Sequence, residues 1–375
     1  MRGMRLSWRD ARVRAVLWQM LILAALAWGV WLVIGNTGRN LAARHIATGF
    51  GFLGQAAPIP IGETPIAYEP SVSTYARALL IGLLNTLKVS VVGIVLATVL
   101  GVVVGIARLS GNFLAARLSA AYVELLRDTP PLLQLLVWYG LLQTLPPPRQ
   151  ALQPLPGVFL TNRGLLLPGL EWQPAHSAAL GGLLLGGVLL FALRRRARLA
   201  VAAPLLLVAL PLAAWAALGA PFSWQVPVLH GFNFQGGLAL TPEYAALLIG
   251  LSIYTSAYIA EIVRSGIQAV AKGQWEAAVA LGLTRGQTLR LVVLPQALRV
   301  IIPPLTSEYL NLAKNSSLAV AIGYQDLVSV ADTTLNQTGQ SIESIAIVMA
   351  VFLAISLSIS AFMNWYNAHV ALVER

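Results

Sequence analysis

Long apolar runs separated by short polar or basic segments dominate the hydropathy pattern of the chain. A helix of about 20 residues, rising about 1.5 Å per residue, crosses the roughly 30 Å hydrocarbon core of a bilayer. The pattern predicts eight membrane-spanning helices, at residues 15–34, 78–107, 122–145, 178–193, 199–218, 243–263, 297–324 and 345–366. The first run is long for a secretory signal and has no nearby cleavage site, so we expect it to persist as a span.

Composition narrows the class of protein. The 375 residues are 57% hydrophobic and only 10% charged, and the mean hydropathy is +0.74. So little charge excludes an ordinary soluble domain and indicates an all-α integral membrane protein in contact with lipid. The net charge of +11 could suit nucleic acid, but the arginines stand at the ends of apolar runs, as in membrane proteins. We therefore expect no nucleic-acid partner.

The basic residues favour one orientation of the spans. With both termini in the cytoplasm, 18 basic residues fall in cytoplasmic segments and five in external ones. This bias agrees with the excess of Lys and Arg in cytoplasmic loops. It places a tight basic turn at residues 194–198 in the cytoplasm, and it leaves external loops at 36–74, 146–173, 221–241 and 325–341.

A polar segment at residues 274–295 lies between two spans on the cytoplasmic side. Gly282 divides it into a short helix rich in small residues and a second helix that runs up to Pro295. Thr284 followed by Gln287 is a capping-box pattern that starts the second helix. Such an elbow could enter a groove on a cytosolic partner. The alternative is an amphipathic helix pair at the membrane surface that contacts only its own chain.

The elbow also carries a motif at fixed spacing: Glu-Ala-Ala, three residues, Gly, nine residues, an aliphatic residue, any residue, Leu-Pro. Its residues here are Glu276, Ala277, Ala278, Gly282, Val292, Leu294 and Pro295. In this respect the chain resembles the permease subunits of bacterial ABC importers. The resemblance implies that the elbow couples the chain to a separate ATP-hydrolysing subunit.

Two further segments resemble the polar and general L-amino-acid branch of this family, the histidine- and glutamate-type permeases. Residues 127–134 follow its Arg-Gly-Thr-Pro-Leu-Leu-x-Gln segment, with Asp128 in place of the usual Gly and an extra Pro131. Residues 314–318 match its Lys-Asn-Ser/Thr-Ser-Leu segment. Adjacent prolines must bend or break the third span, either as part of a moving gate or as a static kink. The inserted pair of spans at 178–218 resembles the longer subunits of the branch.

The resemblance covers about residues 79–143 and 241–366 and implies a type I importer permease core with an inserted helical hairpin. We expect residues 1–78 to form an N-terminal cytoplasmic segment, first span and external loop, and 79–145 the first part of the core. External loops and the hairpin follow at 146–240, the second part of the core at 241–366 with the elbow at 265–299, and a cytoplasmic tail at 367–375.

The same resemblance implies a location in the bacterial inner membrane and a set of partners. These are two ATPase subunits that use ATP and Mg, a second permease chain, and an external amino-acid-binding protein. Whether the second permease is the same or a different protein stays open, as does the choice of amino acids. We expect no cofactor in this chain.

Polar residues inside the sixth and seventh spans repeat at helical spacing and so share one face of each helix. Because polar side chains in a span avoid lipid, such a face lines a water-filled route or contacts another helix. The residues that we expect along an amino-acid path are Tyr254, Ser256, Glu261, Asn311 and Asn315. Two alternatives are pairing of Glu261 with Arg264 at the membrane surface and hydrogen bonding of the seventh span to a second permease chain.

Nothing in the sequence indicates an enzyme. There is no GxxxxGK[ST] phosphate loop, no HExxH and no GxSxG, and the four histidines are far apart, so we expect no catalytic or metal site. ATP would then be hydrolysed by a partner. The competing hypothesis is an ion-gradient-driven secondary transporter or a channel, although we find no internal repeat of the kind that secondary transporters carry.

Overall fold

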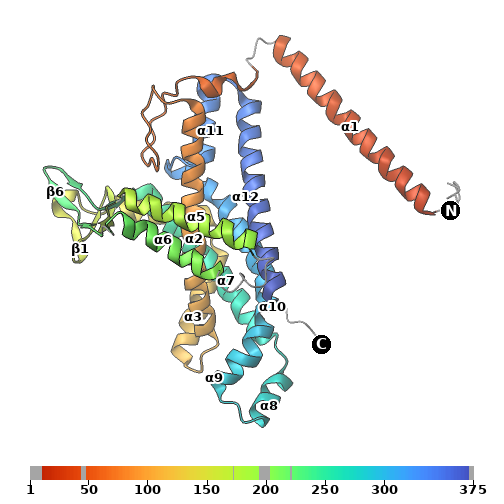
Figure 1. Cartoon of the computed structure of the whole chain (residues 1–375), viewed down its shortest axis with the longest axis vertical. Helices are drawn as coiled ribbons and strands as arrows, with labels where there is room; N and C mark the ends of the chain where they lie inside the picture. The colour runs from red at the N-terminus through yellow and green to blue at the C-terminus, as the bar shows by residue number, and fades with distance from the viewer. Residues whose placement is uncertain (1–10, 44–47, 172, 194–202, 220–221, 371–375) are drawn as a thin grey trace. The chain divides into compact units, whose positions relative to one another are not determined.

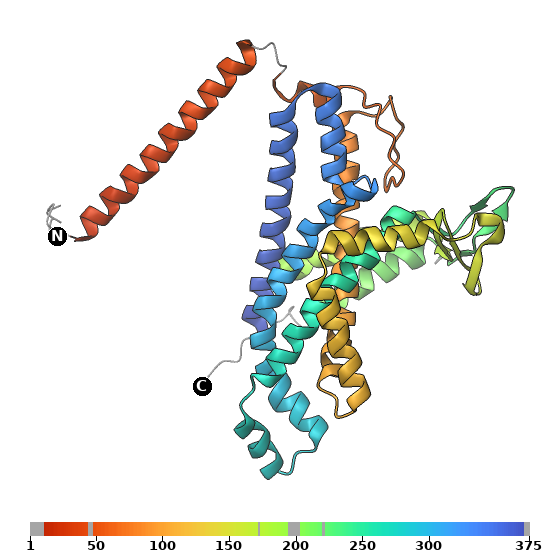
Figure 2. The ribbon, with the colours of Figure 1, turned by 180° about the vertical axis from the view of Figure 1, so that it is seen from behind.

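A computed structural model describes residues 11–43, 48–171, 173–193, 203–219 and 222–370. Helices hold most of these residues (Figures 1 and 2). The chain divides into two units, Met1–Asn85 with Gln325–Leu357, and Thr86–Tyr324 with Ser358–Arg375. Two long helices, α2 (Tyr75–Arg108) and α12 (Ser341–Val370), contribute residues to both units.

The first unit contains α1 (Ala11–Ala43), the 3-10 helix η1 (Phe50–Gly54), α11 (Leu327–Thr338) and the first parts of α2 and α12. Its core packs Phe52 and Tyr75 against Leu327 of α11. The Tyr75 hydroxyl also donates a hydrogen bond to the Gln337 side chain at 2.9 Å. In α1, by contrast, the most apolar stretch has no buried residue.

Helix α11 replaces the loop that we expected at residues 325–341. Asp326 begins the helix as its N-cap, accepting a hydrogen bond from the Ser329 backbone at 2.9 Å. Asn85 of α2 donates to the Gln325 carbonyl at 2.9 Å and so holds the segment before the cap. Burial raises the pKa of the Asp326 carboxyl to about 6, against the opposing effect of its backbone hydrogen bonds. The loop prediction was wrong because it missed this cap and the apolar face that follows it.

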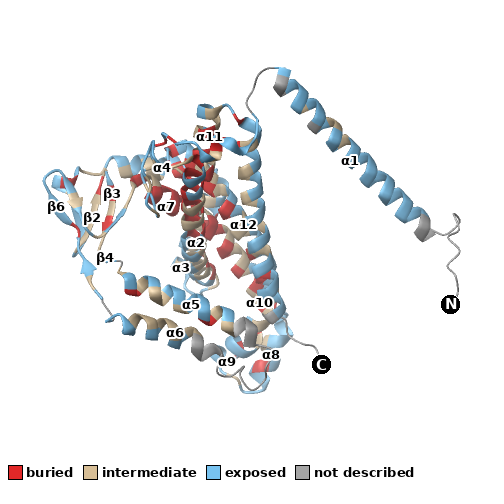
Figure 3. Cartoon of the chain, turned by 45° about the horizontal axis from the view of Figure 1, so that its top comes forward, coloured by how far each residue is buried: buried red, intermediate tan, exposed pale blue. Residues whose placement is uncertain are grey.

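The second unit is built around α7 (Pro242–Gln268). In its most apolar window 67% of the residues are buried, the highest share among the candidate spans that the described residues contain (Figure 3). Thr241 caps the helix by accepting from the Tyr244 backbone at 3.2 Å. A Cβ added at Gly101 of α2 would lie 2.6 Å from Ile259, and one at Gly105 would lie 2.7 Å from the Ala260 carbonyl. These two glycines therefore let α2 and α7 pack closely.

Five helices in the described residues are long and apolar enough to cross a membrane. They correspond to predicted spans one, two, six, seven and eight. The other three predicted spans contain shorter apolar helices, at residues 131–143, 174–189 and 207–217. The predicted order of apolar segments is therefore present in the described part of the structure.

The third predicted span is broken into α3 (Phe113–Asp128) and α4 (Pro131–Gln143), both packed against α7. Pro130 is the N-cap of α4 and Pro131 its first residue, a position where the missing N–H costs nothing. The buried Gln134 amide donates to the carbonyls of Leu126 and Thr129, at 2.8 and 3.0 Å. One side chain thus satisfies carbonyls that the end of α3 leaves open.

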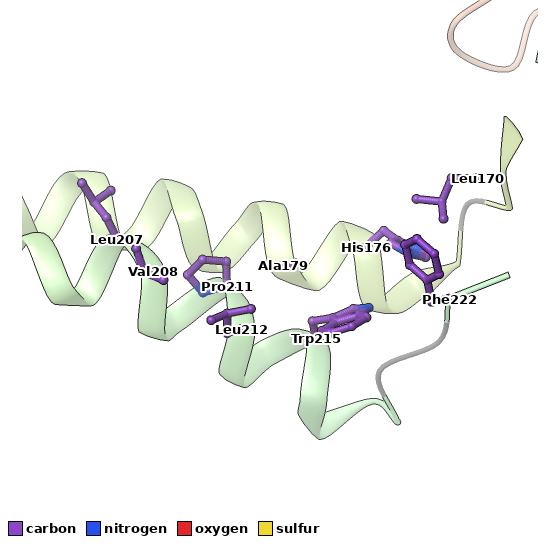
Figure 4. A pocket seen from close by; sticks show the side chains of 9 residues that line it. All are labelled: Leu170, His176, Ala179, Leu207, Val208, Pro211, Leu212, Trp215 and Phe222. Carbon is purple, nitrogen blue, oxygen red and sulfur yellow. The ribbon is translucent and has the colours of Figure 1, made fainter. Parts of the chain in front are cut away.

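The inserted hairpin consists of α5 (Pro174–Leu193) and α6 (Ala203–Ala217). The two helices touch at Gly182, where an added Cβ would lie 2.8 Å from the Leu210 carbonyl. A pocket of about 490 Å³ lies between them, lined by apolar side chains such as Leu212, Trp215 and Phe222 (Figure 4). The predicted basic turn at 194–198 lies outside the described residues.

Short strands flank the hairpin in sequence, where we expected only external loops. Before it come the 3-10 helix η2 (Pro148–Gln150), β1 (Leu152–Leu155), β2 (Val158–Thr161), β3 (Gly164–Leu167) and β4 (Gly169–Leu170). After it come β5 (Trp224–Gln225), β6 (Val228–His230), β7 (Asn233–Gln235) and β8 (Leu238–Leu240). The antiparallel sheet β1-β2-β3-β8 is accompanied by the pairs β4-β5 and β6-β7.

Helix α10 (Leu294–Asn315) continues through Pro303 and Pro304 and is followed by the 3-10 helix η4 (Ser316–Ile322). These adjacent prolines do not interrupt the helix. Both prolines are exposed in the described structure. Prolines are also tolerated in membrane helices, where surrounding groups compensate the lost backbone bonds.

Candidate functional site

A helical elbow joins α7 to α10 and lies at one end of both helices (Figure 1). It consists of α8 (Lys272–Ala280), a turn at Gly282 and α9 (Arg285–Thr288). Gly282 has a φ of +76°, and a Cβ built there would meet nothing within 4 Å. The left-handed backbone, rather than lack of space, is therefore what requires glycine at this position.

Backbone hydrogen bonds fix the end of α8. The Gly282 N–H donates to the Val279 carbonyl at 2.9 Å, and the Leu283 N–H donates to the Ala278 carbonyl at 3.1 Å. This pair of bonds is the Schellman arrangement, which terminates a helix at a left-handed residue. The elbow therefore bends at a defined residue.

The start of α9 confirms the predicted capping box. The Thr284 side chain accepts from the Gln287 backbone at 3.4 Å, while the Gln287 side chain accepts from the Thr284 backbone at 2.9 Å. A second prediction, that this helix ends at Pro295, was wrong. A π-helical segment, η3 (Leu289–Val293), connects α9 directly to α10, and Pro295 lies in the first turn of α10. The wider turn accommodates a proline that has no N–H to donate.

One side of α8 packs against the core of the second unit, and the other side is exposed to solvent in this chain. Ala278 is buried and Trp275 packs against the core cluster that includes Val293. On the outer side, Val279 is 67% exposed and Leu281 is 80% exposed.

The predicted coupling residues divide between these two sides. Glu276, Ala277 and Gly282 are exposed, whereas Ala278 is buried. Leu294 is 42% exposed and Pro295 is half-buried. The elbow thus presents a carboxylate, small residues and apolar side chains on one projecting surface.

A polar cluster lies within the second unit, where α3, α7 and α10 meet. The Tyr254 hydroxyl donates to the Tyr258 hydroxyl at 3.2 Å. The guanidinium of Arg127, near the end of α3, lies 5.1 Å from the centre of the Tyr258 ring. The Glu308 carboxylate on α10 interacts electrostatically with Arg127 and is hydrogen-bonded to the Asn311 side chain. A cation, an anion and two phenols are therefore grouped at one place.

The other three predicted path residues lie elsewhere. Ser256 is fully buried and shares a 2.7 Å hydrogen bond with Tyr122 of α3, so it joins two helices. Glu261 pairs with Arg108 of α2 and with Arg264, whose Nη2 lies 2.5 Å from a carboxylate oxygen. The pairing with Arg264 is the alternative that the sequence left open. Asn315 ends α10 and is half-buried.

Sequence reasoning missed Arg127 as a partner of this cluster, because the 18 basic residues counted as cytoplasmic include Arg127, although it lies within the third predicted span. The signal that could have found it is the break at Thr129–Pro130, which ends α3 partway through a predicted span. A helix of 16 residues is only about 24 Å long, so its last turn does not reach the far side of a bilayer.

Long apolar helices packed closely at glycines, with a projecting helical elbow, define a multi-pass membrane protein. The family described as the binding-protein-dependent transport system inner membrane component matches residues 177–372. The chain belongs to this family. The resemblance to permease subunits of ABC importers is thereby confirmed.

Two full-length relatives refine the comparison. The putative amino-acid ABC transporter permease protein YhdX of Escherichia coli (strain K12) is 49% identical, over 99% of this chain and 97% of that protein. The general L-amino acid transport system permease protein AapQ of Rhizobium johnstonii is 47% identical, over 98% of this chain and 94% of that protein. A solved amino acid ABC transporter chain is 23% identical, covers 79% of this chain and 95% of its own length, and has a TM-score of 0.49.

Proposed function

We propose that this chain is the permease subunit of an ATP-driven importer that carries L-amino acids across the bacterial inner membrane. The observation that supports this most directly is the elbow, whose motif residues are held on a projecting, partly apolar surface. Exposed Val279 and Leu281 beside the Glu276 carboxylate suit a groove on a cytosolic ATPase. The names of the two full-length relatives support amino acids as the substrate class.

The elbow transmits force because its bend is fixed. The Schellman turn at Gly282 and the capping box at Thr284 hold α8 and α9 at a set angle. Helix α9 then continues through η3 into α10, which carries Glu308 and Asn311. When ATP binding closes the ATPase pair, movement of α8 would therefore reach the polar cluster through continuous helix. ATP and Mg belong to the partner in this mechanism, and this chain hydrolyses nothing and holds no cofactor.

The polar cluster offers the two charges that every amino acid requires. Arg127 suits the α-carboxylate, since a guanidinium binds carboxylates with two parallel hydrogen bonds. Glu308, with Asn311 beside it, suits the α-ammonium group. Neither charge recognises a side chain, so this path would accept many amino acids. The predicted roles of Tyr254 and Asn311 are retained in this proposal. Ser256, Glu261 and Asn315 contribute at most by holding the helices that carry the cluster.

Both termini are cytoplasmic in the proposed topology, because this orientation gives the positive-inside bias and places the elbow where an ATPase can reach it. An external binding protein delivers the amino acid, and a second permease chain completes the path. Residues 1–10 and 371–375 lie outside the described part of the chain.

The experiment that tests this function is reconstitution in proteoliposomes with the ATPase, second permease and binding protein encoded beside this chain. We expect uptake of labelled L-amino acids that requires ATP and stops when a non-hydrolysable analogue replaces it. Uptake that persists without ATP while an ion gradient is maintained would instead assign the chain to the secondary transporters.

A further inference from the structure

The strands on either side of the α5–α6 hairpin form one small body, which we call the β platform (residues 147–170 and 224–240). The β6–β7 pair packs on the four-stranded sheet through Phe159 and Phe234, whose ring centres lie 4.5 Å apart. Segments that precede and follow the whole hairpin in sequence are thereby held together. The platform is consequently a folded surface rather than two loose loops.

Two arginines meet in one pocket on this platform. The pocket has a volume of about 250 Å³ and is lined by Arg149, Arg163, Asn162, Phe232 and the prolines 147 and 148. Among the residues that the structure describes, neither arginine forms an ion pair. Two like charges in one concavity repel each other unless an anion sits between them.

Arg149 lies in the 3-10 helix η2, and Arg163 lies between two paired strands. The Arg149 guanidinium lies 3.9 Å from the centre of the Phe232 ring, and its Nε donates to the Gly231 carbonyl at 3.4 Å. Arg163 lies in the turn between β2 and β3, where its backbone N–H donates to the Thr161 hydroxyl oxygen at 3.1 Å. The ring contact and the hydrogen bond hold the Arg149 charge in place before a ligand arrives, which reduces the entropy lost on binding.

The platform also exposes large apolar side chains, one of which, Phe232, lines the pocket. Phe232 is 70% exposed, Leu155 63% and Val228 54%. Aromatic residues and arginine are enriched at protein–protein interfaces. The combination of apolar side chains with two positive charges matches a protein surface that carries carboxylates.

The platform and the elbow lie at opposite ends of α7. Strand β8 ends at Leu240, just before α7, whereas α8 follows its last residues. With 27 residues, α7 separates the two by about 40 Å. If the elbow is cytosolic, as the proposed function requires, the platform lies on the extracytoplasmic side of the membrane.

We propose that the β platform is a docking surface for the extracytoplasmic amino-acid-binding protein, with Arg149 and Arg163 receiving carboxylates from that protein's surface. The inference rests on the proposed function for the identity of the partner, but its evidence is independent of the elbow. The platform is formed by the segments on either side of the inserted hairpin. Its role would be to position the binding protein over the path.

The test compares the double variant Arg149→Glu/Arg163→Glu with wild-type protein in the complete reconstituted complex. The ATPase rate is measured while purified binding protein, loaded with L-glutamate, is titrated. We expect the concentration for half-maximal stimulation to rise about tenfold or more, with an unchanged basal rate and a weaker dependence on salt. Gln153→Glu is the matched control, because it adds a negative charge to the exposed strand β1 outside the pocket. It should behave like wild type.

Several outcomes would overturn the proposal. These are an unchanged titration in the double variant, an equal shift in Gln153→Glu, or a shift that occurs only when the vesicles contain anionic lipid, which would assign the pocket to lipid headgroups.

If the double variant fails to assemble, Gln150→Cys provides a second test, since the chain has no other cysteine. A cross-linker on that cysteine should capture the binding protein, and its failure to do so contradicts the proposal. Absence of any ATPase from the wild-type complex would instead refute the proposed function itself.

Discussion

Replacing Gly282 by alanine tests the elbow with a change of one methyl group. The φ of +76° at Gly282 is a left-handed conformation, which costs an L-residue roughly 1–2 kcal/mol. No atom lies within 4 Å of the new Cβ, so this conformational cost is the whole effect. Because the elbow is exposed in the isolated chain, the alanine variant can relax there and must recover the bend when it docks. The affinity for the ATPase should then fall roughly 5- to 30-fold.

The control for this prediction is Gly286→Ala. Gly286 also has open space around its Cβ position, but it lies in α9 and does not have a positive φ. Alanine is the better helix former, so this variant should bind at least as well as wild type. Gly282→Asn should fall between wild type and Gly282→Ala, since asparagine adopts the left-handed region more readily.

The assay is titration of the detergent-solubilised permease with fluorescently labelled ATPase, with circular dichroism to confirm an unchanged helix content. The order of dissociation constants should be wild type, then Gly282→Asn, then Gly282→Ala. Equal affinities for wild type and Gly282→Ala, or equal losses at Gly282 and Gly286, would refute the argument that a left-handed bend presents the elbow.

Three further variants test other parts of the account. Glu276→Lys reverses an exposed charge on α8 and should abolish co-purification of the ATPase while the protein still inserts into the membrane; retention of the ATPase would exclude Glu276 from the contact. Arg127→Met should reduce uptake about tenfold or more with the complex still assembled, whereas Arg117→Met, nearer the start of the same helix, should not; equal uptake by both would remove Arg127 from the path. Burial raises the pKa of Asp326 to about 6, whereas an aspartate in the unfolded chain has a pKa of about 4. The raised pKa therefore contributes stability that is fully present below about pH 4 and is lost as the pH rises through 6. Asp326→Asn keeps the cap, so it should stabilise the protein by about 2–3 kcal/mol at pH 7.5 and flatten the pH dependence of the thermal midpoint; an unchanged slope between pH 5 and 7.5 would contradict this.

The features that could be predicted from sequence are those that depend on residues close together in the chain. Thr284 and Gln287 are three positions apart, and their reciprocal hydrogen bonds are present in the structure. Gly101 and Gly105 are four positions apart, a spacing of small residues that is typical of close helix contacts in membranes, and α7 provides that contact. The apolar runs predicted the order of the helices, because burial in lipid needs only a sufficient length of apolar residues.

The features that could not be predicted depend on residues far apart in sequence. The β platform joins β3 to β8 across the inserted hairpin, and short strands with irregular alternation carry little periodic signal. Arg127 meets Tyr258 only because the break after α3 places its last turn beside α7. Burial of Ser256 was equally hidden, since its partner Tyr122 lies on another helix. A polar face on a span therefore predicts avoidance of lipid but not which polar groups meet.

Docking of the elbow on an ATPase is the central claim, and a single cysteine tests it most directly. The substitution Leu281→Cys introduces the sole thiol of the chain, at the most exposed apolar position of the elbow. In inverted membrane vesicles that contain the complete complex, a short bifunctional maleimide should cross-link this introduced thiol to the ATPase subunit, and ATP should change the yield. No cross-link to the ATPase, together with labelling of the same thiol by an impermeant maleimide added to intact cells, would contradict the account.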